Sequence, residues 1–255
     1  MSSLATTKPL NRPCAALGHV WNWPSPAPEP LLTLECFVDY CCPFSARIFK
    51  RLTEDVIPHY NKTSEGPKIK LIFQQIPQPW HPQSATMHES YVTFPSPLPL
   101  FNKRSQTFLT RFFFLLSCSV CAVRHLYGIK FTNEWQTLLM AHREEFVDAL
   151  CQDESRNQIS SRLAKLAATI EGIEEEAVMD RMSVNVTENA KNSGSASIRV
   201  LKFYVKQHRQ LGIHVSPTTR INNMIVETSS GWTLSEWNCF LDPMLQLASN
   251  GYKRN

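Results

Sequence analysis

The chain has 255 residues and a mass of 29.2 kDa, which fits one large domain or one domain with a substantial insertion. A hydrophobic content of 43% with 19% charged residues excludes an intrinsically disordered or collagen-like chain. The net charge is only +4, and the basic residues are spread along the chain, so we expect no nucleic-acid partner. Neither G-x-x-x-x-G-K-[ST] nor G-x-G-x-x-G occurs, which excludes the strongest nucleotide-binding signatures.

The cysteines and the apolar stretches indicate the cellular compartment of the protein. Eight cysteines in a chain of this length do not form the disulfide framework of a small secreted domain. Residues 1–30 contain no apolar run of the length that a signal peptide needs. The longest apolar stretch without a charge, residues 112–123, is too short to cross a bilayer. We therefore expect a cytoplasmic protein with reduced cysteines and no transmembrane segment.

The first third of the chain shows a β-α-β pattern. Residues 1–30 contain six prolines and are expected to form an extended leader. An apolar strand is predicted at 31–39, a helix with apolar residues at helical spacing at 43–60, and a second strand at 68–76. This order is typical of two parallel strands joined by a crossover helix.

Helical spacing then dominates the middle of the chain, and a strand-like pattern returns near the C-terminus. Strands at both ends with helices between them predict an α/β domain that carries a helical insertion. The expected elements are helices at 134–150, 157–170, 174–182 and 195–211, a strand at 218–226 and a final helix at 234–248.

Candidate chemistry lies at the first junction between strand and helix, where the sequence reads DYCCPFS. Cys42 directly precedes Pro43, a residue favoured at the first position of a helix. A thiol at this place faces unsatisfied N–H groups and the positive end of the helix dipole, which favour the thiolate nucleophile. The alternative interpretation is that Cys42 is only a small residue at the start of the helix.

Two segments resemble those of a known family. Residues 37–49, FVDYCCPFSARIF, resemble the active-site segment of DsbA-like members of the thioredoxin superfamily, D-x-x-C-P-[FWY]-[CS]. Residues 212–222, GIHVSPTTRIN, are similar to the family's G-x-x-x-[ST]-P-T segment, in which the proline is cis and faces the active-site cysteine. The resemblance covers approximately residues 31–250.

The resemblance implies a thioredoxin-like α/β fold, a central mixed sheet flanked by helices, with an inserted helical domain. The thioredoxin-like domain is expected to comprise 31–78 and 212–250, and the helical insertion 79–211. The resemblance also implies that Val215, Ser216 and Pro217 contact the substrate beside Cys42.

The second cysteine of the family's C-x-x-C pair is replaced by Ser45. A dithiol oxidoreductase uses that second thiolate to release a mixed disulfide, which a serine cannot do. The Ser45 hydroxyl can instead donate a hydrogen bond to the Cys42 thiolate. Cys41 is not assigned as the resolving thiol, because a disulfide between adjacent cysteines is strained.

The consistent mechanism is monothiol. Cys42 forms a mixed disulfide with a thiol or disulfide substrate, and glutathione or another external thiol resolves it. No cofactor or metal is expected beyond glutathione as a co-substrate. Two alternatives stay open, namely a glutathione-binding transferase or isomerase of the same fold, and a thioredoxin-like binding module without catalytic activity.

Other chemistry-bearing residues receive more modest interpretations. Cys118 and Cys121 form a C-x-x-C without a strand, proline and helix around it, so we interpret them as buried structural thiols. His81 and His88 are seven positions apart, too far for a shared metal on a helix, and a surface or interdomain role is expected. Asp39 is a candidate proton relay by the resemblance, or it only stabilises the end of the strand. Glu89 clusters with the two histidines after the second strand, and Trp80 and Trp232 are expected to be core or rim aromatics.

One segment does not fit the family pattern. Residues 92–117 contain three prolines and then a dense Phe and Leu stretch, FLTRFFFLLS. Codons for Phe, Leu and Ser are pyrimidine-rich, so one hypothesis is a retained intron. The alternative is a lineage-specific loop with a hydrophobic patch for a partner or membrane surface. Sequencing the transcript distinguishes the two.

Overall fold

The fold was obtained as a computed structural model. Almost all of the segment 92–117, and Cys118 with it, lies outside the described residues, so the intron hypothesis and the C-x-x-C interpretation stay predictions. The structure describes residues 18–24, 29–92, 120–184, 195 and 198–252.

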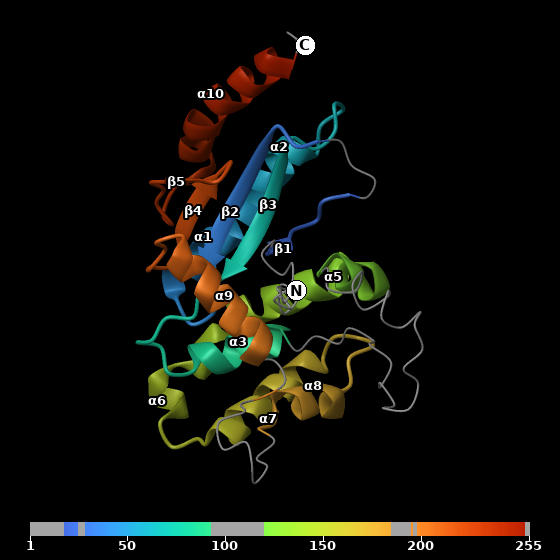
Figure 1. Cartoon of the computed structure of the whole chain (residues 1–255), viewed down its shortest axis with the longest axis vertical. Helices are drawn as coiled ribbons and strands as arrows, with labels where there is room; N and C mark the ends of the chain where they lie inside the picture. Colours follow the sequence, from blue (N-terminus) through green and yellow to red (C-terminus); the bar gives the residue numbers. More distant parts are fainter. Residues whose placement is uncertain (1–17, 25–28, 93–119, 185–194, 196–197, 253–255) are drawn as a thin grey trace, which may run out of the picture.

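A mixed five-stranded sheet forms the centre of the molecule (Figure 1), with the strand order β1-β3-β2-β4-β5. β2 and β3 are parallel, and all other neighbours are antiparallel. The two parallel strands are almost wholly buried, which explains why both read as continuous apolar runs. The strands are β1 (His19–Val20), β2 (Leu32–Val38), β3 (Ile69–Gln75), β4 (Thr218–Ile221) and β5 (Met224–Val226).

The crossover helix predicted at 43–60 connects β2 to β3. It comprises α1 (Pro43–Lys50), a π-helical stretch (Arg51–Val56) and α2 (Ile57–Asn61) in direct succession. Its apolar face, which includes Ile48, packs on the sheet and belongs to the main core. The predicted β-α-β unit is therefore confirmed.

The N-terminal segment contributes a strand that the composition of residues 1–30 did not predict. His19–Val20 pairs antiparallel with β3 at one edge of the sheet. Gly18, with φ 62°, precedes this strand, and a Cβ there would lie 2.6 Å from the Ile72 side chain and 2.7 Å from the Phe73 carbonyl oxygen. Only glycine allows the backbone to lie so close to β3. The proline-rich composition of residues 1–30 does not predict this close contact.

The prediction of a single strand at 218–226 is wrong in one respect. The segment forms a hairpin of two antiparallel strands, β4 and β5. Asn222 and Asn223 have φ angles of 46° and 70° and form the turn between β4 and β5. Asparagine tolerates this left-handed backbone better than most residues, so the pair closes a tight hairpin.

The helix predicted at 134–150 is also interrupted. α5 (Val120–Ala141) ends early, and a short 3-10 helix (Arg143–Phe146) separates it from α6 (Asp148–Cys151). Val147 has an extended backbone with ψ 158°, which ends the helical path before α6 begins.

The helical block lies at one end of the sheet, below β2 and β3 in Figure 1, while α10 extends from the other end. One core of buried apolar residues continues from the sheet into the block and includes Leu34, Trp135 and Leu163. Within the described residues, no helix has the length and apolar character needed to cross a membrane. The remaining helices are α3 (Ser84–Val92), α5 (Val120–Ala141), α6 (Asp148–Cys151), α7 (Arg156–Ala167), α8 (Glu175–Met182), α9 (Ile198–Gln210) and α10 (Leu234–Tyr252).

Candidate active site

Cys42 is the residue from which α1 begins. Its backbone is extended, with φ −77° and ψ 121°, and Pro43 follows in the first turn of the helix. The side chain makes no capping hydrogen bond, and its thiol donates to the carbonyl oxygen of Ser216 over 3.6 Å. Cys42 is 4% exposed, so neighbouring residues cover most of its surface and restrict the approach of a reagent to the sulfur.

The register of β2 and β4 explains why Ser216 lies beside Cys42. Phe37, near the end of β2, pairs with Thr218 at the start of antiparallel β4. The loop that precedes β4 therefore reaches the same sheet edge as the residues that follow β2. The Ser216–Pro217 peptide bond is cis, and Val215 beside it is 58% exposed.

Ser45 lies one helical turn after Cys42 and is fully buried. Its hydroxyl oxygen accepts a hydrogen bond from the backbone N–H of Asp39 over 3.2 Å. The contacts of the described residues include no hydrogen bond between Ser45 and Cys42. Ser45 thus holds the end of β2 against α1, and its hydroxyl proton is left for another acceptor.

Cys41 differs sharply from its neighbour. Its sulfur lies 3.3 Å from the sulfur of Met87. Burial, followed by the negative charge of Asp39, raises the pKa of the Cys41 thiol well above its ordinary value. The described cysteines are all free thiols, so Cys41 is a protonated thiol and not half of a disulfide with Cys42.

Asp39 organises the end of β2 through four hydrogen bonds to its buried carboxylate. The backbone N–H groups of Cys41 and Gln78 donate over 2.9 and 3.0 Å. The Ser84 hydroxyl donates over 2.8 Å, and His81 Nδ1 lies 2.8 Å from the other carboxylate oxygen. These contacts tie the end of β2 to the loop between β3 and α3.

His88 adds to this cluster from α3. Its side chain is fully buried, with Nδ1 2.6 Å from Gln75 Oε1 and Nε2 3.7 Å from Asp39 Oδ1. His88 is therefore not at the surface and instead joins α3 to the ends of β2 and β3, which agrees with the interdomain alternative, while the His81 side chain is 24% exposed. The spacing of these residues in the sequence does not predict the cluster. His88 and Asp39 are far apart in the chain and meet only where α3 packs against the end of β2.

Glu89, which follows His88 in α3, faces a different neighbour. It pairs with Arg156 of α7 over 2.5 Å and accepts a hydrogen bond from the Ser195 hydroxyl. It therefore connects α3 to α7 within the helical block. Among the described residues, no three His, Cys, Asp or Glu side chains are grouped as a metal ion would require.

The charge state of Asp39 predicts a dependence of stability on pH. Burial would raise its pKa, but the interactions with His88 and His81 and the N–H of Cys41 outweigh burial and lower the pKa to about 2 from 3.8. The folded state thus binds the proton more weakly than the unfolded state. The stabilisation, about 2 kcal/mol, is present above pH 3.8 and is lost as the pH falls through about 2.

We expect urea unfolding between pH 5 and 2 to show this loss, and the Asp39→Asn variant to lack that part of the pH dependence. Equal pH dependence in the two proteins would contradict the assignment. A carboxylate with this pKa stays ionised near neutral pH, so Asp39 acts there as an acceptor of hydrogen bonds. That behaviour corresponds to the second interpretation given from the sequence, stabilisation of the strand end.

A cavity of about 430 Å³ adjoins the site between the β3–α3 loop and α9. Gln78, 3% exposed, lines it. In the orientation that satisfies its hydrogen bonds, the Gln78 amide donates to the His214 carbonyl oxygen and accepts from the Ser216 N–H, both over 3.2 Å. Gln78 thus joins the cavity to the loop beside Cys42. No sequence motif includes Gln78 or the α9 residues of this cavity, so the sequence did not predict them.

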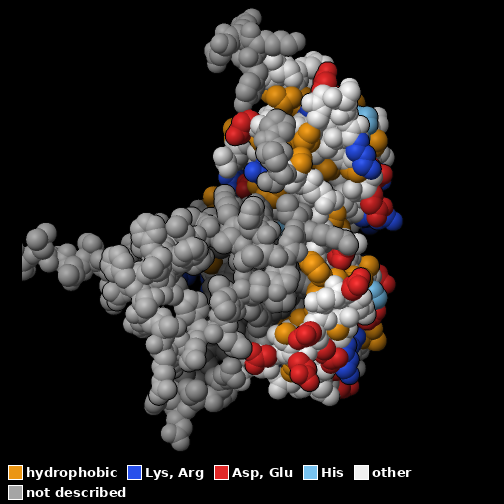
Figure 2. Space-filling view, turned by 90° about the vertical axis from the view of Figure 1, so that its right-hand side faces the viewer, with side chains coloured by type: hydrophobic (Ala, Val, Ile, Leu, Met, Phe, Trp, Pro, Cys, Tyr) orange, Lys and Arg blue, Asp and Glu red, His pale blue; other side chains and the backbone are white. Residues whose placement is uncertain are grey.

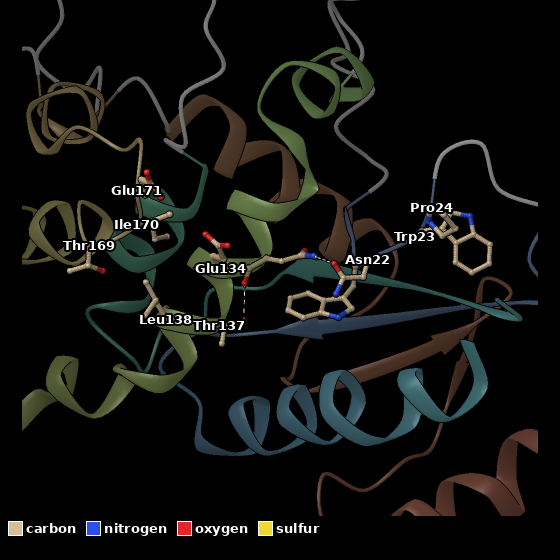
Figure 3. Close-up of a pocket in the computed structure, with 11 residues that line it drawn as sticks. Asn22, Trp23, Pro24, Glu134, Thr137, Leu138, Thr169, Ile170 and Glu171 are labelled. Atoms are coloured by element: carbon tan, nitrogen blue, oxygen red, sulfur yellow. Dashed lines mark hydrogen bonds between the residues drawn. The ribbon is translucent and has the colours of Figure 1, made fainter. Parts of the chain in front are cut away.

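A larger cavity of about 870 Å³ shares no lining residue with the first (Figure 3). Trp23 and Pro24 line one side, Glu134 of α5 lies between, and Ile170 and Glu171 line the other side. The candidate site residues named from the sequence do not line it. Trp80, 57% exposed, lines the smaller cavity, whereas Trp232 packs against the main core.

Comparison with known proteins decides the fold. No family model matches the chain, and no curated protein matches it. A candidate protein-disulfide isomerase from Pseudomonas syringae is similar in structure, with a TM-score of 0.56 and 20% identity, over 89% of this chain and 99% of that one. BdbD from Bacillus subtilis has a TM-score of 0.53 and 14% identity, over 92% of this chain and 96% of its own.

This chain has the DsbA-like thioredoxin fold. The predicted fold class, a mixed sheet flanked by helices and interrupted by a helical insertion, is thereby confirmed. At such identities a likeness establishes the fold, and fold alone does not determine activity. The roles of Cys42, Ser45 and the Ser216–Pro217 loop within the DsbA-like fold therefore depend on their own geometry.

Proposed function

We propose that the protein is a thiol-disulfide oxidoreductase that acts by a monothiol mechanism through Cys42. The observation that carries this proposal is the position of the Cys42 sulfur, at the start of α1 and 3.6 Å from the Ser216 carbonyl oxygen. The first turn of a helix presents N–H groups without intrahelical acceptors, and its dipole stabilises an anion there. The Cys42 sulfur lies in this first turn, and a nucleophilic sulfur there is the basis of the proposed exchange.

The proposed reaction has two exchange steps. In the first, the Cys42 thiolate attacks one sulfur of a substrate disulfide, the new S–S bond forms, and the other substrate sulfur leaves as a thiolate that takes a proton from water. In the second, an external thiolate attacks the substrate sulfur of the mixed disulfide, forms a new disulfide with it and releases the Cys42 thiolate. Ser45 and Cys41 are both unsuited to the second step, one lacking sulfur and the other being a protonated, half-buried thiol.

Glutathione is the external thiol of this proposal. A monothiol cycle consumes a reduced thiol at every turn, and the cytoplasm supplies glutathione in reduced form. We therefore also propose the cytoplasm as the place of action.

A binding module is the second candidate function, favoured by the 4% exposure of Cys42 and by the loss of the second thiol. Alkylation of Cys42 as a function of pH separates the two. Rapid modification by iodoacetamide at pH 6 supports the enzyme, because the thiolate is the reactive form. Modification that becomes rapid only well above pH 8 supports the binding module.

Restoring the second thiol provides a direct test. The Ser45→Cys variant is expected to reduce a disulfide-bonded protein such as insulin about tenfold faster than the wild type. A thiol one helical turn from Cys42 makes resolution of the mixed disulfide intramolecular. Insulin turbidity with dithiothreitol as the terminal reductant measures the rate.

Ser45→Ala is the matched control, because it removes the same hydroxyl without adding sulfur. It is expected to show no gain. A Ser45→Cys protein that folds normally and turns over no faster than Ser45→Ala would contradict the proposal and favour the binding module.

A further inference from the structure

The ionisable side chains that line the cavity beside the site are all basic. Arg209, His81, His208 and His214 line it, and its lining contains no Asp or Glu among the described residues. His81 Nδ1 contacts Asp39. Arg209 takes part in no salt bridge recorded for the described residues.

His208 lies among the basic side chains of this cavity and has one ring nitrogen without a partner. Its Nδ1 donates to the Ile213 carbonyl oxygen over 3.1 Å, and its buried Nε2 has no hydrogen-bond partner among the described residues. Burial first, and then the positive groups of Arg209, His88 and His214, lower the pKa of His208. A bound anion would favour the protonated form of His208, and the Nε2–H of that form would donate to the anion.

The positive lining is a local feature of the molecule. α8 begins with consecutive glutamates at 174–176, and Figure 2 shows acidic side chains gathered on the lower, helical part of the face that it displays. The net charge of the whole chain is only +4. An anion is therefore drawn to the cavity by its own lining and not by a uniformly basic surface.

The cavity is also connected to the reacting sulfur. Gln78 lines it and hydrogen bonds to the Ser216 N–H, and the Ser216 carbonyl oxygen accepts from Cys42. A volume of about 430 Å³ is within the range of roughly 300–1,000 Å³ that small-molecule sites occupy. A ligand held here therefore adjoins the Ser216 loop, which contacts Cys42.

We propose that this cavity binds the carboxylate end of the low-molecular-mass thiol or disulfide that reacts at Cys42, and that Arg209 provides its main charged contact. The co-substrate is accordingly anionic, as glutathione is, and not neutral or cationic. The inference rests on the proposed function, since it places the carboxylate relative to the exchange at Cys42.

The first test compares disulfides of opposite charge. Arg209→Gln is expected to slow the reaction of Cys42 with glutathione disulfide about tenfold, the loss that follows from one charge-assisted hydrogen bond, and to leave the reaction with cationic cystamine unchanged or faster. Lys206→Gln is the matched control, because Lys206 is exposed on the same helix and does not line the cavity. Stopped-flow fluorescence or quenched mass spectrometry gives the rates.

The second test needs no reaction. S-methylglutathione, which cannot exchange, is titrated calorimetrically into the Cys42→Ser protein, and binding is expected to weaken about tenfold with Arg209→Gln and with increasing salt. Equal rates of reaction with glutathione disulfide in the wild type and in Arg209→Gln, or equal losses with both disulfides, would overturn the cavity assignment while Cys42 chemistry stands. A third outcome combines Arg209-dependent binding of S-methylglutathione with no reaction of Cys42 with either disulfide in the wild type. It would support the cavity as an anion site and overturn the proposed function.

Discussion

Replacing Cys42 by serine is expected to abolish mixed-disulfide formation between this protein and glutathione disulfide, lowering the rate at least about a thousandfold, to the background of the other cysteines. The expectation follows from the place of its sulfur, at the first turn of α1 and against the Ser216 carbonyl. A serine hydroxyl in the same place is not ionised near neutral pH and forms no bond to sulfur. Intact-protein mass spectrometry after exposure to glutathione disulfide detects the adduct directly.

Cys41→Ser is the matched control, because it is the same substitution one residue earlier. Cys41 has its pKa raised by burial and by the charge of Asp39, and its sulfur contacts Met87, so most of the adduct is expected to remain. An adduct that survives in Cys42→Ser and disappears in Cys41→Ser would reverse the assignment of the nucleophile. Circular dichroism on both variants checks that the fold is intact.

Asp39→Asn is expected to be the most destabilising single exchange at the site, at about 3–5 kcal/mol of unfolding free energy. The carboxylate is fully buried and accepts hydrogen bonds at both oxygens, including those from the Gln78 N–H and the Ser84 hydroxyl. An amide keeps one acceptor oxygen and turns an NH₂ group toward donors, which leaves buried donors without partners. Urea unfolding at neutral pH measures the loss.

Asp55→Asn is the corresponding control on the surface. Asp55 pairs with Arg51 one turn away on the crossover helix, and the two side chains are 42% and 36% exposed. Such a pair contributes about 0–1 kcal/mol, so the control variant is expected to unfold almost as the wild type does. Equally small losses of unfolding free energy in Asp39→Asn and Asp55→Asn would show that the hydrogen bonds at Asp39 do not stabilise the fold.

Part of this protein is encoded locally and is readable without the structure. The apolar runs at 31–39 and 68–76 and the helical spacing at 43–60 predicted the β-α-β unit that the sheet confirms. The Cys42–Pro43 dipeptide marked the start of α1, because proline suits the first turn of a helix. These features depend on residues close together in the chain, so periodicity and helix-start signals suffice to predict them.

The surroundings of Cys42 were decided only by the tertiary structure. His88 is buried against Asp39, and Gln78 links the cavity to Ser216, although spacing along the chain predicted neither contact. Both follow from how α3 and the loop before β4 meet at the end of β2. The physical reason is that burial and hydrogen-bond partners depend on which distant segments the sheet register brings together, whereas a sequence pattern reports only the preference of each segment by itself.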